Sequence, residues 1–100
     1  MAKTQQQENK QRQYQCKEPS LWHVVMHNDD VTTMDFVVMV LIKVFRKTQT
    51  DAERIMLKIH NEGAAVVGTY YKDIAMSKAF YVKSLAKQNG FPLKLTIEEA

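Results

Sequence analysis

A polar segment with the sequence HNDD, at residues 27–30, separates an apolar run from a patterned helix. Its amide and two adjacent carboxylates could close a turn and cap the helix, or they could bind a small cation. His60 lies in a later helical stretch, four residues after Met56. That spacing by itself favours a boundary histidine whose ring nitrogens are satisfied locally. The alternative is that His60 joins Asn28 and Asp29 around a cationic ligand.

Nucleophilic catalysis requires an activated Ser, Cys or Lys beside a base. Cys16 lies in a polar N-terminal tail, and Ser20, Ser77 and Ser84 occur in none of the usual motif settings. The two aspartates of the polar segment are adjacent, so they would point in different directions and seldom form a glycosidase-like pair. We therefore expect no enzymatic activity, no catalytic residue and no cofactor.

The three histidines of the chain, His23, His27 and His60, are the candidate metal ligands. On a strand, residues four apart lie roughly 13 Å from each other, because each residue advances about 3.3 Å. That distance is too long for two ligands of one tetrahedral zinc. The sequence therefore predicts no metal site, and a histidine-based metal-binding protein is kept as an alternative.

The charge of the chain is close to balanced once its tail is set aside. The net charge is +3, and residues 1–20 carry four Lys or Arg against two Glu, while the remaining 80 residues hold ten basic and nine acidic side chains. This balance argues against nucleic-acid binding, which needs a clustered basic face. No apolar run reaches the ~18 residues of a membrane span, and the N-terminus lacks a signal-peptide core. We expect a cytoplasmic monomer with no nucleic-acid or membrane partner.

The chain divides into a flexible N-terminal extension at residues 1–20 and one domain at residues 21–100. The extension has no apolar period and ends in Pro-Ser. The first strand is expected at residues 21–27, where Trp22, Val24 and Met26 share one face. AAVVGTYY and the alternating LKLTI at residues 93–97 are the later strands.

Three helices are expected between these strands. The first begins at a cap formed by Thr32 and Thr33 and ends near residues 46–47, and its apolar stripe consists of Val37, Val40, Leu41, Val44 and Phe45. The second opens at Thr50 in a capping box and stops at Gly63, and the third covers residues 73–88. The order β-α-α-β-α-β predicts an α+β fold with helices on one face of a small sheet. The pattern leaves the order and direction of the strands open.

Four segments of the domain resemble the ClpS family, the adaptors that deliver N-degron substrates of the N-end rule to the ClpAP protease. They are HVVMHNDDVTTMDFVV at 23–38, AERIMLKIHNEG at 52–63, GTYYKDIAMSKA at 68–79 and NGFPLKLTIEEA at 89–100. They occur in the family's order and spacing, and they cover nearly everything from Leu21 onward. With this resemblance, the predicted fold is a small antiparallel three-stranded sheet packed against three helices.

The resemblance implies a module that binds the free N-terminus of proteins beginning with Leu, Phe, Tyr or Trp. The family residues that hold the α-ammonium correspond to Asn28, Asp29 and His60. An ammonium has three donors, and an amide oxygen, a carboxylate and an imidazole nitrogen supply three acceptors. The resemblance also implies a hydrophobic pocket for the first side chain, lined by Asp30, Thr32, Met34, Val37, Met56, Ile59 and Leu93. In the family, the residue matching Met34 excludes β-branched first residues.

The resemblance further implies docking on the N-domain of the ClpA unfoldase, through charged residues that match Asp73 and Lys78. The N-terminal extension would engage the same machine during transfer. The chain departs from the family at Thr33, where Pro is usual, at Val31, where an aromatic is frequent, and at residues 76–77, where Glu-Thr is common. The alternative function is a small α+β regulatory module that binds an internal peptide or a protein surface through its third helix.

Overall fold

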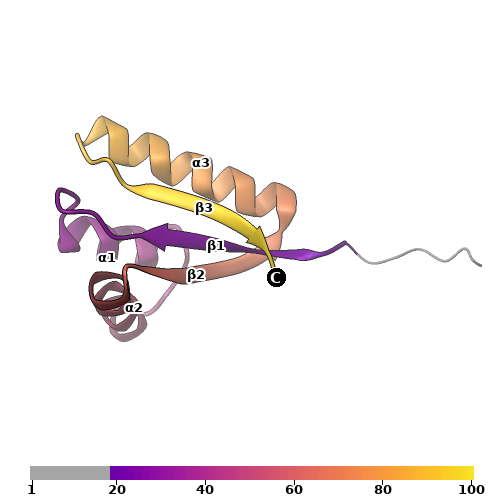
Figure 1. Cartoon of the computed structure of the whole chain (residues 1–100), viewed down its shortest axis with the longest axis horizontal. Coiled ribbons are helices and arrows are strands. Elements are labelled where there is room, and N and C mark those ends of the chain that lie inside the picture. Colours follow the sequence, from indigo (N-terminus) through magenta and orange to yellow (C-terminus); the bar gives the residue numbers. More distant parts are fainter. Residues whose placement is uncertain (1–18) are drawn as a thin grey trace, which may run out of the picture.

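The computed structural model describes residues 19–100, so the predicted extension lies outside the described residues except for Pro19 and Ser20. The described part contains six elements in the predicted order (Figure 1): β1 (Leu21–His27), α1 (Met34–Lys43), α2 (Gln49–Glu62), β2 (Ala64–Tyr71), α3 (Lys72–Gln88) and β3 (Lys94–Glu99). None of the helices among these residues is long and apolar enough to cross a membrane.

The three strands form one antiparallel sheet in the order β2-β1-β3, so β1 is central. Val24 and Met26 of β1 are fully buried, and Trp22 packs against the same core, as the period-2 pattern predicts. The helices cover this face, with α1 and α2 toward the β2 side and α3 running beside β3 (Figure 1). The α+β prediction is therefore confirmed, with the strand order added by the structure.

The N-cap of α1 is Thr33, whose hydroxyl accepts a hydrogen bond from the Phe36 amide at 3.1 Å. The predicted pair Thr32 and Thr33 thus does not act as a unit, because the Thr32 hydroxyl instead donates to Asp29 at 2.7 Å. Thr33 has φ −74°, close to the angle that proline would impose. This residue therefore starts the helix without the proline that is usual in the family.

The end of α1 at Lys43 is about one turn earlier than predicted. The chain leaves the helix through Arg46, which has φ +61°, and the Lys47 amide closes the turn on the Leu41 carbonyl at 3.0 Å. Lys78 of α3 donates from Nζ to the Val44 carbonyl at 3.0 Å. A cation at this position complements the negative end of the helix dipole and satisfies a carbonyl that has no partner within the helix.

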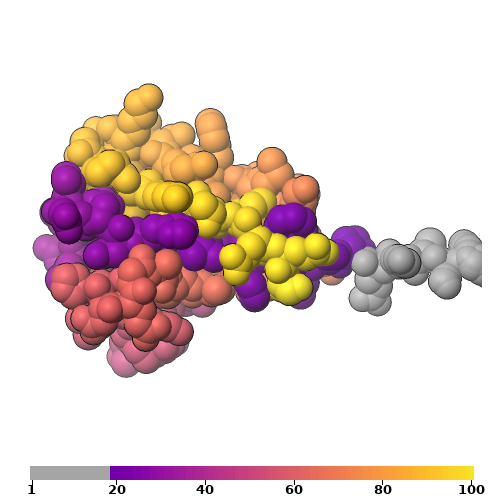
Figure 2. Space-filling view, in the orientation of Figure 1, coloured from indigo at the N-terminus to yellow at the C-terminus, as the bar shows by residue number. Residues whose placement is uncertain are grey.

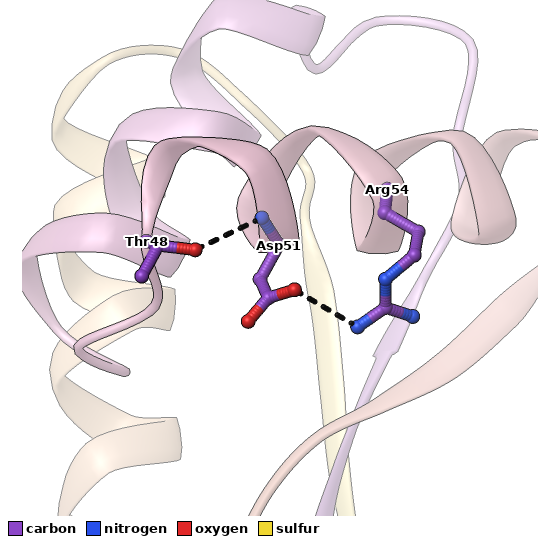
Figure 3. Close-up of polar contacts among 3 residues, drawn as sticks. All are labelled: Thr48, Asp51 and Arg54. Carbon is purple, nitrogen blue, oxygen red and sulfur yellow. Dashed lines mark hydrogen bonds and ion pairs between the residues drawn. The ribbon is translucent and has the colours of Figure 1, made fainter.

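The N-cap of α2 is Thr48, two residues before the predicted Thr50, and its hydroxyl accepts from the Asp51 amide at 3.1 Å (Figure 3). Figure 3 also shows Arg54 reaching back to the Asp51 carboxylate at 3.4 Å. The predicted start was therefore wrong by two residues. Each threonine has an acidic residue three positions later, Asp51 after Thr48 and Glu53 after Thr50, so both threonines were candidate caps. The other end agrees with the prediction, since Gly63 terminates α2 at φ +92°.

The last two elements differ from the predicted bounds by one or two residues. α3 begins at Lys72 instead of residue 73, and β3 covers Lys94–Glu99 instead of residues 93–97. β3 extends further because the register with β1 continues to the pair of Trp22 and Glu99. These differences leave the core as the helical and strand periods indicate, with Val40, Leu41, Ala75 and Val82 among its buried members.

Candidate functional site

A cavity of about 220 Å³ opens where the loop after β1 meets the start of α1 and the last turns of α2. Nine residues line it: Asn28, Asp29, Asp30, Thr32, Met34, Val37, Met56, Ile59 and His60. Five of these side chains are polar and four are apolar. The volume lies below the ~300–1,000 Å³ of cavities that enclose drug-sized ligands. The space therefore suits one side chain with an attached polar group better than a long stretch of peptide.

The loop between β1 and α1 is organised by the Asp29 carboxylate. Its Oδ1 accepts from the amides of Val31 at 2.8 Å and Thr32 at 2.7 Å, and its Oδ2 accepts from the Thr32 hydroxyl at 2.7 Å. Burial by itself raises the pKa of Asp29, but the hydrogen bonds from Thr32 and Val31 lower it more. The pKa of this carboxyl is therefore held below its ordinary value, and the group stays a charged acceptor at neutral pH.

The loop is joined to the end of α2 through the backbone of Asn28. Its amide donates to the Gly63 carbonyl at 2.8 Å, and Gly63 is the left-handed residue that terminates α2. His60 lies in the last turn of the same helix, with its side chain exposed. One short bond therefore fixes the segment carrying Asn28 and Asp29 against the helix end that carries His60, although 32 positions separate residue 28 from residue 60.

The apolar wall of the cavity comes from two helices. Val37 of α1 and Ile59 of α2 are buried at 7% and 3% exposure, so they belong to the core and to the cavity wall at once. Met56 is half-buried, while Met34, the first residue of α1, is 45% exposed. Met34 thus has the freedom of a side chain at the rim, and its unbranched thioether can adapt to a neighbour.

The structure brings together nine of the ten residues that the resemblance assigned to the ammonium site and the pocket. Leu93 is the exception, since it is buried at 6% exposure in the core cluster and does not line the cavity. It precedes β3 and shares that cluster with Val37 and Ile59. Leu93 can therefore support the cavity wall through packing. No residue lines the cavity that the sequence had not already singled out.

The two predicted docking residues lie on α3, away from the cavity. Asp73 is exposed in the first turn, and its Oδ1 lies 2.9 Å from the Ile74 amide, which donates to it. Lys78 is half-buried, with Nζ on the Val44 carbonyl and 5.3 Å from the centre of the Tyr70 ring. Asp73 is thus available to a partner, whereas Lys78 already holds the end of α1.

The histidines do not gather around one point. Nδ1 of His23 lies 2.8 Å from the Thr69 hydroxyl, and Nε2 of His27 lies 2.9 Å from the Thr96 hydroxyl. Both belong to β1, and each ring is engaged by a neighbouring strand. Within residues 19–100, no three His, Cys, Asp or Glu side chains are grouped so that they could hold a metal ion.

Comparison with known proteins identifies the family of the chain. The family model described as "ATP-dependent Clp protease adaptor protein ClpS" matches residues 17–96. The chain belongs to the ClpS family. Members of this family are adaptor proteins of the Clp protease and not enzymes, which agrees with the expectation from the sequence.

Individual ClpS proteins are similar to this chain over most of its length. The ClpS of Acetivibrio thermocellus is 51% identical over 82 residues, which are 82% of this chain and 83% of that protein. The ClpS of Clostridium acetobutylicum is 43% identical over 97% of this chain and 96% of its own length. Among solved structures, Agrobacterium tumefaciens ClpS2 bound to L-phenylalaninamide superposes with a TM-score of 0.80 at 41% identity, covering 83% of this chain and all of ClpS2.

Proposed function

We propose that this ClpS-family protein binds the free N-terminus of proteins that begin with Leu, Phe, Tyr or Trp and delivers them to the ClpAP protease. The observation that carries the proposal is the composition of the cavity, which joins a group of polar acceptors to an apolar recess of about 220 Å³. An N-terminal residue has the matching composition, since its α-ammonium and its side chain branch from the same carbon. An internal residue lacks that ammonium.

The polar part of the cavity receives the α-ammonium. Removing an ammonium from water is costly unless acceptors replace its hydration, and Asn28, Asp29 and His60 supply an amide oxygen, a carboxylate and an imidazole nitrogen. The lowered pKa of Asp29 keeps this carboxyl ionised, so its charge opposes that of the ligand. Asp29 still has free lone pairs, because a carboxylate can accept about four hydrogen bonds and this one accepts three.

The apolar part receives the first side chain. Met34, Val37, Met56 and Ile59 form its walls, and burying a Leu or Phe side chain against them contributes roughly 1.5–3 kcal/mol. This energy is lost for small first residues, so the pocket selects large ones. The ligand of the A. tumefaciens ClpS2 structure, L-phenylalaninamide, combines an aromatic side chain with a free α-amino group.

Fluorescence anisotropy with labelled peptides that differ only in their first residue tests this function. We expect binding of peptides that begin with Leu, Phe, Tyr or Trp, and at least tenfold weaker binding of those that begin with Ala or Ser, from the roughly 1.5–3 kcal/mol of apolar burial. The matched control is the Leu-starting peptide with an acetylated N-terminus, which keeps the side chain and removes the charge. Equal affinity for the free and acetylated peptides would contradict the proposal and favour an internal-peptide module.

Delivery requires a second surface, and we assign it to the α3 side of the molecule, with Asp73 docking on the N-domain of a ClpA-like unfoldase. Pro19 and Ser20, where the described chain begins, line one surface depression together with Asp73. The N-terminal extension would thus leave the domain beside the docking site, where it can engage the unfoldase. In this proposal a single copy is the binding unit. The proposed location is the cytoplasm.

An Asp73→Lys substitution tests the docking surface separately from ligand binding. Asp73 does not line the cavity, so the affinity for a Leu-starting peptide should remain unchanged. Binding to the isolated ClpA N-domain should weaken, and degradation of a Leu-starting reporter by ClpAP should slow accordingly. Undiminished N-domain binding by the variant would show that α3 does not dock in this way.

A further inference from the structure

Methionine supplies two of the four apolar side chains that line the ligand cavity. Met34 begins α1, and Met56 lies on α2. The other two, Val37 and Ile59, are aliphatic and belong to the buried core. Peroxides oxidise a thioether to a sulfoxide, whereas they leave valine and isoleucine intact. The apolar wall therefore contains two groups whose polarity can change without a change of sequence.

The methionines of the described chain differ widely in their access to solvent. Met26 is fully buried, and Met39 and Met56 are half-buried. Met34 is 45% exposed and Met76 is 53% exposed. An oxidant arrives from the solvent, so we expect these two exposed residues to react before the other three. Of the two, only Met34 lines the cavity.

Met34 stands at the junction of solvent and cavity. Figure 2 shows this end of the molecule, where the purple surface of the segment after β1 lies beside the coral surface of α2. The hydrogen bonds of Asp29 hold the loop, and the Thr33 hydroxyl caps α1. None of these bonds uses the Met34 side chain. A change at its sulfur therefore alters the cavity wall and leaves the fold in place.

Oxidation of a methionine by hydrogen peroxide forms one sulfur–oxygen bond. The Sδ atom gives up two electrons and takes one oxygen atom of the peroxide, and the other oxygen atom leaves as water. The product, methionine sulfoxide, is polar, and dedicated reductases return it to the thioether with a dithiol as reductant. The modification is therefore reversible.

A sulfoxide at Met34 can take two positions, and both weaken the contact between a ligand and the apolar wall. Against the first side chain of the ligand, its oxygen would lie next to carbon and lose its hydrogen bonds to water. Turned outward, it would keep those bonds, but the wall would lose one of its four apolar side chains and the ligand part of its burial. Both positions favour the unbound protein.

We propose that Met34 is an oxidation site, through which peroxide reversibly weakens the binding of N-terminal residues to this protein. This role of Met34 rests on the proposed function, because it concerns the pocket for the first side chain. Under oxidising conditions the adaptor would release its substrates, and a methionine sulfoxide reductase would restore their binding. Met76 is exposed as well, but it lies on α3 and outside the cavity, so its sulfoxide should leave the ligand affinity unchanged.

Fluorescence anisotropy with a labelled Leu-starting peptide, before and after treatment of the protein with hydrogen peroxide, tests the proposal. A Cys16→Ser background removes the single cysteine, which peroxide would also oxidise. Peptide mass spectrometry should find the added oxygen at Met34 and Met76 before the buried methionines. The affinity should fall about fivefold or more, because part of the apolar burial is lost. Methionine sulfoxide reductases with dithiothreitol should restore it.

Three variants in the same background assign the effect to one residue. Met34→Leu keeps an apolar side chain of similar size without a sulfur, so its affinity should be the same before and after peroxide. Met76→Leu removes the other exposed thioether and should lose affinity on treatment as the parent does. Met34→Gln places a polar, unbranched side chain at the rim and should weaken binding without any oxidant.

The outcomes separate this role of Met34 from the proposed function. Absence of binding by the untreated protein would overturn the proposed function, and the role of Met34 with it. Where the untreated protein binds, unchanged affinity after complete oxidation of Met34 would overturn the role of Met34 alone. An equal loss of affinity in Met34→Leu would do the same, because another residue would then be responsible. So would a Met34 that stays unmodified while Met76 is oxidised.

Discussion

Replacing Asp29 by Asn and by Ala separates the two roles of its carboxylate. In the ligand-free protein, the group holds the loop by accepting from the Val31 amide, the Thr32 amide and the Thr32 hydroxyl. In the proposed complex it also faces the α-ammonium. Asn keeps an oxygen for the two amides and a nitrogen that can donate to the reoriented Thr32 hydroxyl, but it has no charge. Ala removes the acceptors as well as the charge.

The stability of the variants follows from the hydrogen bonds. Asp29→Ala should lower the free energy of unfolding by about 1–2 kcal/mol. This is the low end of the range expected for the loss of three hydrogen bonds, because Asp29 is half-exposed in a surface loop. Asp29→Asn should cost less. The pKa of Asp29 is lower in the folded chain than its ordinary value of 3.8. The contribution of the charge is therefore present above that value and is lost as the pH falls through the lowered pKa.

Peptide affinity measures the role of the charge. Asp29→Asn should weaken binding of a Leu-starting peptide about 5- to 30-fold, the equivalent of about 1–2 kcal/mol for a charge-assisted contact replaced by a neutral one. Urea unfolding and fluorescence anisotropy on the same preparations give both quantities. Unchanged affinity in Asp29→Asn would refute direct contact with the ammonium. Unchanged stability in Asp29→Ala would refute the role of the carboxylate in the loop.

Three further predictions concern other residues. Met34→Ala should admit peptides that begin with Ile or Val, since the stiff β-branched side chains would no longer meet the thioether at the rim; continued rejection of Ile in a titration would argue against a gate. His60→Ala should weaken binding of a Leu-starting peptide about 5-fold, because one of the three proposed acceptors of the ammonium is lost; unchanged affinity in an anisotropy titration would argue against that contact. Arg46→Gly should raise the free energy of unfolding by about 0.5–1 kcal/mol in a urea titration, because Arg46 has φ +61°; no gain would mean that side-chain contacts of Arg46 offset its strain.

The elements of the fold were predictable from the sequence because their signals are local. The alternation in β1 identifies the buried face that carries Val24 and Met26, and Gly63 identifies the end of α2. Helix starts were less certain, since any threonine near the first turn can act as a cap. Which one does so depends on what else competes for its hydroxyl. Thr32 is engaged by Asp29, so Thr33 caps α1.

The residue types that line the cavity were also predictable, but the fact that they lie together was not. Spacing alone favoured a boundary role for His60 and left the role of the HNDD segment open, and only the resemblance to ClpS joined them. The structure supplies the physical connection, the bond from the Asn28 amide to the Gly63 carbonyl. Leu93 differs from these residues. The resemblance assigned it to the pocket, whereas the structure places it in the core and outside the cavity lining.

The sequence by itself determined the type and order of the elements, because these follow from short-range periodicity, and it supplied the polar and apolar side chains that line the cavity. Tertiary structure decided which distant residues share one cavity and which strand lies at the centre of the sheet. It also decided that Lys78 of α3 holds the end of α1. These outcomes depend on packing between elements that are far apart in the chain, and no local pattern encodes them.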